Sequence, residues 1–193
     1  MGEPPAPPLF FAVPAPEELR RQAARVQDDL RRALGPVRFP PLEGLHVTLA
    51  FLGPADPGRL PGLLDLAAAA TAGCRGFTLR SAGLGGFPRP ARARILWLGF
   101  DPQPALEALA QGLREALEAR SVPFDSKPFQ AHLTLARFRE PVDLAQIPFA
   151  PVESVSFPVD RFGLWQSERT PRGSRYRSLG DLLLGAGSRQ SCT

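Results

Sequence analysis

The sequence predicts an α+β fold made of two similar lobes. Short apolar runs that suit strands alternate with longer stretches whose apolar residues recur at helical spacing, and a helix-then-strand order occurs twice. One five-residue motif also occurs twice, at residues 46–50 and 132–136, so that its two copies start 86 positions apart in a chain of 193 residues. Repeated elements that cannot bury themselves alone usually pack against each other, and we therefore expect two related halves.

The first half of the chain is expected to form strand, helix, strand and helix. Residues 9–13 are a continuous apolar run that prolines stop. A helix follows over residues 17–34, begun by a proline and two glutamates and ended by Gly-Pro. Its apolar face would consist of Leu19, Ala23, Val26, Leu30 and Leu34. Residues 46–52 form the first motif strand, and a helix rich in leucine and alanine covers about residues 58–72.

The second half repeats this order with additional strands. Residues 76–87 predict a strand interrupted by glycines, and residues 94–100 predict its partner. A helix over residues 104–120 carries four leucines on one face, and the second motif strand follows at residues 132–136. We expect a proline-punctuated loop from there to about residue 151. The last strands are expected at residues 159–166 and 176–184. We predict one bilobal domain over residues 9–184, with a loose tail at 1–8 and a disordered tail at 185–193.

Each motif strand has one apolar face and one face that carries an imidazole and a hydroxyl. Alternate side chains of a strand share a face, so His46, Thr48 and Ala50 are expected on one face and Phe51 on the other. Ordinary half-buried strands with incidental polar residues are the simpler interpretation of one such motif.

The second copy of the motif favours a functional role over incidental polar residues. His132 and Thr134 repeat the pattern, and the two motifs together contain both histidines of the chain. Two such strands that meet across a cleft would present two imidazoles and two hydroxyls to one ligand, so we favour a catalytic interpretation.

The residue types around the histidines narrow the chemistry. Neither cysteines nor clustered carboxylates accompany them, the G-x-S-x-G pattern of a serine nucleophile does not occur, and no glycine-rich phosphate loop or dinucleotide fingerprint is present. We therefore expect no metal and no cofactor. A histidine near its reference pKa of about 6.5 can hold or accept a proton at neutral pH. Two of them beside a phosphorus centre could deprotonate water and protonate the departing oxygen, while threonine hydroxyls bind the phosphate oxygens.

Bulk properties leave the partner open. The net charge of +4 and the pI near 10.0 fit an anionic partner such as nucleic acid, but a general bias towards arginine explains them equally well, since Lys127 is the only lysine. Cys74 and Cys192 are far apart and suggest neither a disulfide framework nor a metal cluster. Without a signal peptide or a membrane-spanning run, a cytoplasmic protein is expected, with no membrane partner.

The doubled motif and its flanking residues resemble the two-histidine (2H) phosphoesterase superfamily, and within it the RNA 2′,3′-cyclic phosphodiesterases once described as 2′–5′ RNA ligases. The resemblance covers most of the chain. It rests on LFFA at 9–12, HVTLAFLG at 46–53, LWLG at 96–99, HLTLAR at 132–137 and QS at 166–167. The chain departs from the family pattern at Phe39, where tryptophan is usual, and at Ala131, where proline is usual.

This resemblance implies two pseudo-symmetric lobes, each a sheet with covering helices, and a central cleft with a His-x-Thr-x strand on each side. It also implies opening of a 2′,3′-cyclic phosphate on RNA to leave a 2′-phosphate. By the same resemblance, His46 would be the proton donor to the leaving oxygen and His132 the proton acceptor from water. The partner would be an RNA end, such as that of a tRNA fragment, or a small cyclic nucleotide, and we expect a monomer.

Two further residues are substrate-binding candidates. The resemblance relates Arg137 to phosphate binding, but strict alternation puts it on the face opposite His132. Either the strand ends or bulges at Ala136, or Arg137 is structural. Phe11 is a candidate for stacking on a base, although packing in the core is the interpretation that we favour.

Two other functions remain open from the sequence. A ligase-like enzyme could join RNA ends through 2′–5′ bonds, because a cyclic phosphate is already activated. A non-catalytic RNA-binding module could keep the cleft, although intact histidines in both motifs argue against it.

Overall fold

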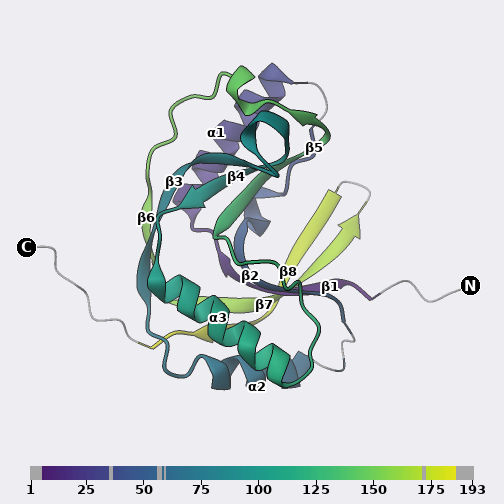
Figure 1. Cartoon of the computed structure of the whole chain (residues 1–193), viewed down its shortest axis with the longest axis vertical. Coiled ribbons are helices and arrows are strands. Elements are labelled where there is room, and N and C mark those ends of the chain that lie inside the picture. Colours follow the sequence, from purple (N-terminus) through teal and green to yellow (C-terminus); the bar gives the residue numbers. More distant parts are fainter. Residues whose placement is uncertain (1–5, 35–36, 56–57, 59, 171–172, 186–193) are drawn as a thin grey trace, which may run out of the picture.

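The computed structural model describes residues 6–34, 37–55, 58, 60–170 and 173–185. The predicted tails therefore lie mostly outside the described residues. All eight named strands join in one curled antiparallel sheet in the order β6-β3-β4-β5-β2-β1-β7-β8 (Figure 1). The strands are β1 (Pro8–Pro14), β2 (His46–Pro54), β3 (Phe77–Phe87), β4 (Ala93–Phe100), β5 (His132–Val142), β6 (Ser156–Val159), β7 (Arg161–Thr170) and β8 (Gly173–Leu183). The single bilobal domain over residues 9–184 stays a prediction.

The sheet has two halves of four strands each, and they meet where β2 pairs with β5. In one half β1 and β2 are antiparallel neighbours joined through the helix α1 (Glu17–Ala33). In the other half β4 and β5 are antiparallel neighbours joined through the helix α3 (Pro104–Ala119). This repeated strand-helix-strand unit confirms the predicted α+β fold of two similar lobes.

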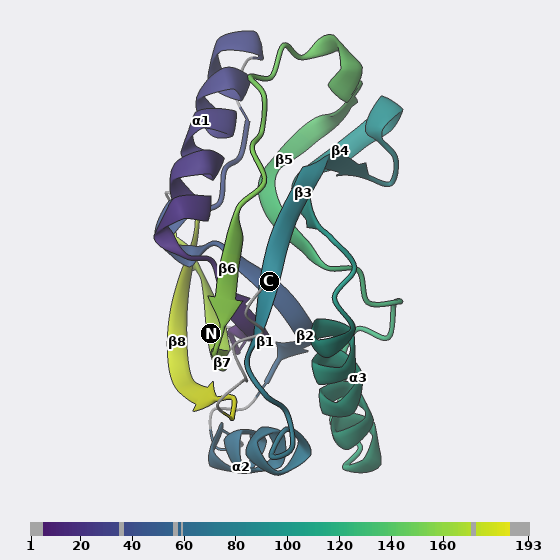
Figure 2. The same cartoon turned by 90° about the vertical axis from the view of Figure 1, so that its left-hand side faces the viewer.

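Each helix packs across the boundary between the halves. Helix α1 contacts β5, and α3 contacts β2 and the shorter helix α2 (Leu60–Ala70). Figures 1 and 2 accordingly show α1 at one end of the molecule and α2 with α3 at the other. The packing buries apolar residues on one stripe of each long helix, as their spacing predicts. These residues are Leu19, Ala23, Val26 and Leu30 of α1 and Leu106, Leu109, Leu113 and Leu117 of α3.

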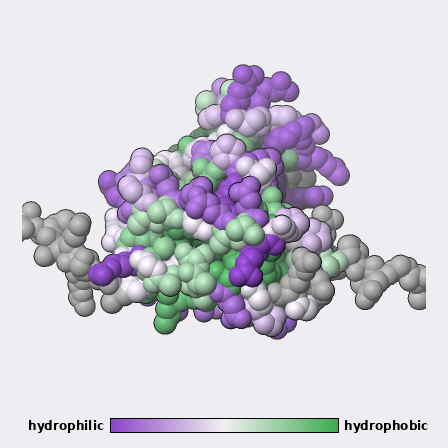
Figure 3. All heavy atoms as spheres, turned by 60° about the horizontal axis from the view of Figure 1, so that its bottom comes forward, coloured by the Kyte–Doolittle hydropathy of each residue, from purple (hydrophilic) through white to green (hydrophobic). Residues whose placement is uncertain are grey.

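Local sequence sets the ends of these helices. Helix α1 follows Pro16 and has two glutamates in its first turn and two arginines in its last turn, which is the charge order that the helix dipole favours. Helix α3 has Pro104 in its first turn, and the side chain of Gln103 accepts a hydrogen bond from the backbone N–H of Ala105. Helix α2 is mostly leucine and alanine, and apolar residues gather in the lower part of the face shown in Figure 3, which brings this end of the molecule forward.

Two segments differ from the prediction. The second motif strand continues to Val142, whereas a loop was expected after residue 136. The chain between residues 156 and 170 forms two strands, β6 and β7, where one was expected. Both regions contain a proline, a residue type that usually interrupts strands. Pro158 is tolerated because β6 is an edge strand, where a missing N–H need not interrupt a ladder.

The burial of α3 gives a stability prediction. Replacing the fully buried Leu113 with alanine should lower the free energy of unfolding by about 2–5 kcal/mol, because a cavity remains in the core. Leu183→Ala is the matched control: this leucine is 80% exposed, and its loss should change stability by less than about 0.5 kcal/mol. Denaturant unfolding of both variants is the measurement, and equal losses would contradict the packing described here.

Candidate active site

The two motif strands lie side by side at the centre of the sheet. Val47 of β2 pairs with Leu133 of β5 in antiparallel register. Continuing that register places His46 across from Thr134 and His132 across from Thr48. A local two-fold relation therefore runs through the Val47–Leu133 pair, and each histidine faces the threonine of the other motif.

A small cavity of about 90 Å³ lies over this pair of strands. Its lining residues are Pro40, Gly44, Leu45, His46, Thr48, His132, Thr134, Arg137 and Tyr176. Five of the six predicted site residues are thus brought together: both histidines, both threonines and Arg137. The two motif strands thus present their polar faces to one cavity.

Matching β-bulges explain how Arg137 reaches the cavity. On β5, Thr134 pairs with Trp97 and Ala136 with Leu96, so Leu135 is an extra residue between them. Leu135 and Ala136 are both buried, and the alternation resumes with Arg137 exposed on the face of the histidine. Of the two alternatives that alternation left open for Arg137, the structure therefore shows the bulge.

The first motif has the same irregularity. On β2, Thr48 pairs with Ala12 and Ala50 with Phe11, so Leu49 is the extra residue. Ala50 is buried and Phe51 is 43% exposed, which reverses the faces that strict alternation predicted for these two residues. Phe51 is the positional counterpart of Arg137 in the other half.

Phe11 lies in the core, which was the favoured interpretation, and not at the site for which it was a candidate. Its side chain is completely buried and packs against Phe162, with ring centroids 6.2 Å apart. A base cannot stack on a ring with no exposed surface, so Phe11 belongs to the core. Its neighbour Phe10 instead faces the site and stacks on the imidazole of His46 at 4.5 Å.

Backbone hydrogen bonds fix both imidazoles in one orientation. The Nδ1 of His46 lies 2.6 Å from the carbonyl oxygen of Gly44, and the Nδ1 of His132 lies 2.7 Å from that of Gln130. Because a carbonyl only accepts, Nδ1 carries the proton in both rings. The Nε2 atom of each histidine is thereby left to accept or donate a proton at a ligand.

Burial lowers the pKa values of both histidines in the free protein. The pKa of His46 falls to about 4, chiefly because desolvation disfavours its charged form, while the hydrogen bond to Gly44 opposes the shift and the charges of His132 and Arg137 add to it. Desolvation also lowers the pKa of His132, again with a contribution from Arg137. Without an anion in the cavity, both imidazoles are therefore neutral at pH 7.

Aromatic rings enclose the histidines on both sides of the cavity. The ring of Tyr176 contacts His46 edge-on at 5.0 Å, and Phe87 contacts His132 in the same way at 5.0 Å. Tyr176 also covers Gly44, where an added Cβ would lie 2.4 Å from its Cδ2 atom, so only glycine fits there. Tyr176 is not recognisable as a site residue from the sequence, because a lone tyrosine near the start of an expected strand carries no motif.

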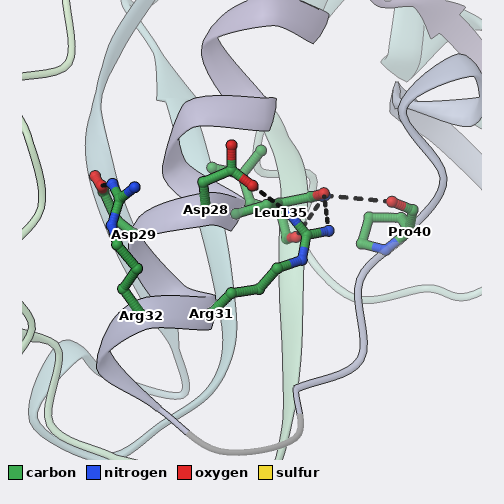
Figure 4. Close-up of polar contacts among 7 residues, drawn as sticks. Asp28, Asp29, Arg31, Arg32, Pro40 and Leu135 are labelled. Carbon is green, nitrogen blue, oxygen red and sulfur yellow. Dashed lines mark hydrogen bonds and ion pairs between the residues drawn. The ribbon is translucent and has the colours of Figure 1, made fainter.

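Gln27 is a second residue near the site that no sequence motif indicates. It lies on the buried side of α1, and its Nε2 donates hydrogen bonds to the carbonyl oxygens of Leu135, at 3.2 Å, and Pro40, at 3.3 Å. Figure 4 shows these two residues beside the helix together with the neighbouring ion pair of Arg31 and Asp28. A polar residue on an otherwise apolar helix stripe was the only signal available in the sequence.

The described part of the chain shows no group of three or more histidine, cysteine, aspartate or glutamate side chains placed to hold a metal ion. Within the same residues, no helix is both long and apolar enough to cross a membrane.

The lowered histidine pKa values predict how stability depends on pH. The unfolded chain, with histidine pKa values of about 6.5, binds more protons than the folded protein below that pH. Stability should therefore decline as the pH falls from about 6.5 towards 4, and these groups should contribute no slope above pH 7. Replacing His46 with glutamine should flatten this decline.

Melting temperatures of wild type and His46→Gln between pH 4.5 and 8 test the prediction. Asp29 and Asp125, whose pKa values are lowered mainly by hydrogen bonds, titrate equally in both proteins and cancel in the comparison. Parallel curves for the two proteins would show that His46 is not desolvated in the folded state.

Comparisons with known proteins agree with this geometry. The family model of the 2′-5′ RNA ligase superfamily matches residues 15–171. The chain is 35% identical over 178 residues to an RNA 2′,3′-cyclic phosphodiesterase of Thermus thermophilus, an alignment that covers 89% of this chain and 87% of the relative. It is 32% identical over 168 residues to a Geobacillus stearothermophilus protein of the same name, where it covers 84% of this chain but spans only 54% of the relative.

Solved structures show the same fold. The crystal structure of Escherichia coli LigT complexed with 3′-AMP superimposes with a TM-score of 0.73 at 31% identity, covering 92% of this chain and 98% of LigT. A phosphoesterase crystal structure matches with a TM-score of 0.72 at 32% identity, covering 93% of this chain and 99% of that chain. Together with the two motif strands around one cavity, these findings show that this chain belongs to the 2′-5′ RNA ligase superfamily of 2H phosphoesterases.

Proposed function

We propose that the protein hydrolyses 2′,3′-cyclic phosphate ends of RNA to 2′-phosphate ends. The observation that carries this proposal is the convergence of two imidazoles, each with its Nε2 free, two threonine hydroxyls and one guanidinium on a single small cavity. The curated relatives named RNA 2′,3′-cyclic phosphodiesterase support the choice of substrate.

The proposed reaction is an in-line displacement at phosphorus. The Nε2 of His132 accepts a proton from water as the water oxygen bonds to phosphorus, and the bond from phosphorus to O3′ breaks on the opposite side. The Nε2 of His46 donates its proton to O3′. The product has a 3′-hydroxyl and a 2′-phosphate, and the two histidines exchange their protonation states with solvent before the next turnover.

The other cavity residues would stabilise the charge that develops on phosphate. The hydroxyls of Thr48 and Thr134 can donate to the two non-bridging oxygens from opposite sides, because each threonine faces the histidine of the other strand. The guanidinium of Arg137 adds a positive charge, and a guanidinium can bind two phosphate oxygens at once.

The shape of the surface supports a nucleotide chain as substrate. The 90 Å³ cavity is smaller than the roughly 300–1,000 Å³ typical of pockets for whole small molecules, so it suits a phosphate group. A larger hollow of about 560 Å³ adjoins it, since Pro40 lines both, and Arg31, Phe39 and Arg175 border that hollow. We infer that the nucleoside portion of the RNA end lies there. The expectations of a cytoplasmic location and a monomer stay predictions.

The decisive experiment is to incubate the protein with a short RNA that ends in a 2′,3′-cyclic phosphate and to identify the product. A 2′-phosphate end is expected, with turnover that persists in excess EDTA. Replacing either histidine with alanine should lower the rate by about 10²–10⁴-fold, the usual range for general acid–base catalysis. Joined RNA ends would indicate a ligase-like reaction instead. Binding that survives loss of both histidines, with no turnover in wild type, would indicate a binding module.

The same assay can separate the two histidine roles. A substrate whose 3′ leaving group is a thiolate needs little protonation, so it should restore the rate of His46→Ala but not that of His132→Ala. Restoration of the His132 variant would mean that the donor and acceptor roles are reversed.

The pKa values also predict the pH dependence of hydrolysis. The profile of kcat/KM reports the free enzyme, in which the pKa values of both histidines lie below 6.5. We therefore expect a bell with its maximum on the acidic side of pH 6.5, and its limbs belong to the coupled pair. The profile of kcat should lie at higher pH, because a bound phosphate anion stabilises the protonated imidazoles. A kcat/KM maximum above pH 7 would contradict the desolvation described here.

A further inference from the structure

Gln27 connects helix α1 to two backbone groups that shape the cavity. Its side chain is 2% exposed, and one amide nitrogen donates to the carbonyl oxygens of both Leu135 and Pro40. Leu135 belongs to the centre of the sheet and Pro40 to the segment before β2, so these bonds join helix α1 both to a segment 13 residues away and to a strand 108 residues away in sequence (Figure 4).

The first acceptor is the bulged residue itself. A β-bulge interrupts the regular ladder and leaves backbone groups of the extra residue without their usual cross-strand partners. A buried carbonyl without a donor is costly, and Gln27 supplies the donor to Leu135. This is the bulge that turns Arg137, two residues further on, to the face of the histidines.

The second acceptor lies at the rim of the cavity. Pro40 lines both the cavity and the adjoining hollow. Close to it, the backbones of Arg38 and Arg137 exchange a pair of hydrogen bonds of 3.2 and 2.9 Å. In this antiparallel pairing Pro40 lies across from Leu135, so Gln27 bridges the two backbones two residues away from the pair that attaches Arg137.

The orientation of the Gln27 amide is itself fixed. Its Oε1 accepts a hydrogen bond from Arg31 at 3.5 Å, and Arg31 is held by Asp28 at 2.6 Å and stacks on the ring of Phe39 at 4.5 Å. Since the oxygen faces the guanidinium, the nitrogen faces the two carbonyls. An apolar side chain of equal size could fill the same space but would satisfy neither carbonyl.

We propose that Gln27 is a positioning residue for the phosphate site, which fixes the bulge at Leu135 and thereby aims Arg137 at the phosphate of the substrate. This inference rests on the proposed function for the identity of the anion. It assigns a role to a helix residue that borders the adjoining hollow but does not line the phosphate cavity, and whose effect on phosphate binding depends on Arg137.

A double-mutant cycle tests this dependence. Gln27→Met keeps the size of the side chain but removes the donor, and it is made in wild type and in Arg137→Ala. We expect it to lower kcat/KM for the cyclic phosphate about tenfold in wild type, mainly through KM, and less than about twofold in Arg137→Ala, because coupled residues do not act additively. The same pattern is expected in the dissociation constant of inorganic phosphate, measured by NMR titration.

Gln22→Met is the matched control. Gln22 lies on the same helix and also donates to a backbone carbonyl, that of Glu153, which is not part of the cavity lining. It should leave kcat/KM and phosphate affinity unchanged in both backgrounds. Thermal unfolding identifies any variant that is not folded at the assay temperature. If Gln27→Met is such a variant, Gln27→Asn, which keeps an amide but withdraws it by one methylene, replaces it in the cycle.

The outcomes separate this inference from the proposed function. Equal fold losses for Gln27→Met in both backgrounds, or a loss of stability with unchanged phosphate affinity, would overturn the positioning role. Failure of the wild-type protein to open the cyclic phosphate would overturn the proposed function. In that case the phosphate titrations of the four proteins still decide whether Gln27 acts through Arg137.

Discussion

The pairing of β2 with β5 is the contact on which the remaining structure depends. Val47 and Leu133 are the register pair between these strands, and this pair joins the two four-stranded halves into one sheet. Antiparallel pairing around that point brings each histidine opposite the threonine of the other motif. Helices α1 and α3 reinforce the seam because each packs on the central strand of the opposite half. A shift of either strand by one residue in this register would turn the imidazole of that strand towards the core and away from the other one.

The bulges make the two nearly equivalent motif strands contribute different side chains to the face that carries the cavity. Each motif has one extra residue after its threonine, and the side chain that then returns to the cavity face is Arg137 on β5 but Phe51 on β2. Among the described residues that line the cavity, Arg137 thus adds a guanidinium on the β5 side without a counterpart on β2. A symmetric scaffold with one asymmetric charge can bind a phosphate in a preferred orientation, which a reaction with distinct proton donor and acceptor requires.

Desolvation and hydrogen bonding act in opposite directions on the two histidines. Burial among aromatic rings favours the neutral imidazoles, while the backbone carbonyls of Gly44 and Gln130 stabilise a proton on Nδ1. This environment keeps an Nε2 lone pair available on His132. An acid at His46 then needs a source of negative charge, and an anionic phosphate in the cavity is the natural one. The protonation states that the proposed reaction needs are accordingly favoured in the complex with phosphate and not in the free protein.

The sequence by itself determined the α+β fold, most element positions and the choice of the histidine and threonine residues, because hydrophobic periodicity and a doubled motif are local signals. Tertiary structure alone decided the faces of Arg137 and Phe51, since a bulge depends on pairing with a neighbouring strand and leaves no mark in the alternation of one strand. It also decided that Phe10 stacks on the imidazole of His46. Gln27 and Tyr176 join the site from a helix and a strand that lie far from either motif in sequence, and only packing across the sheet brings them there.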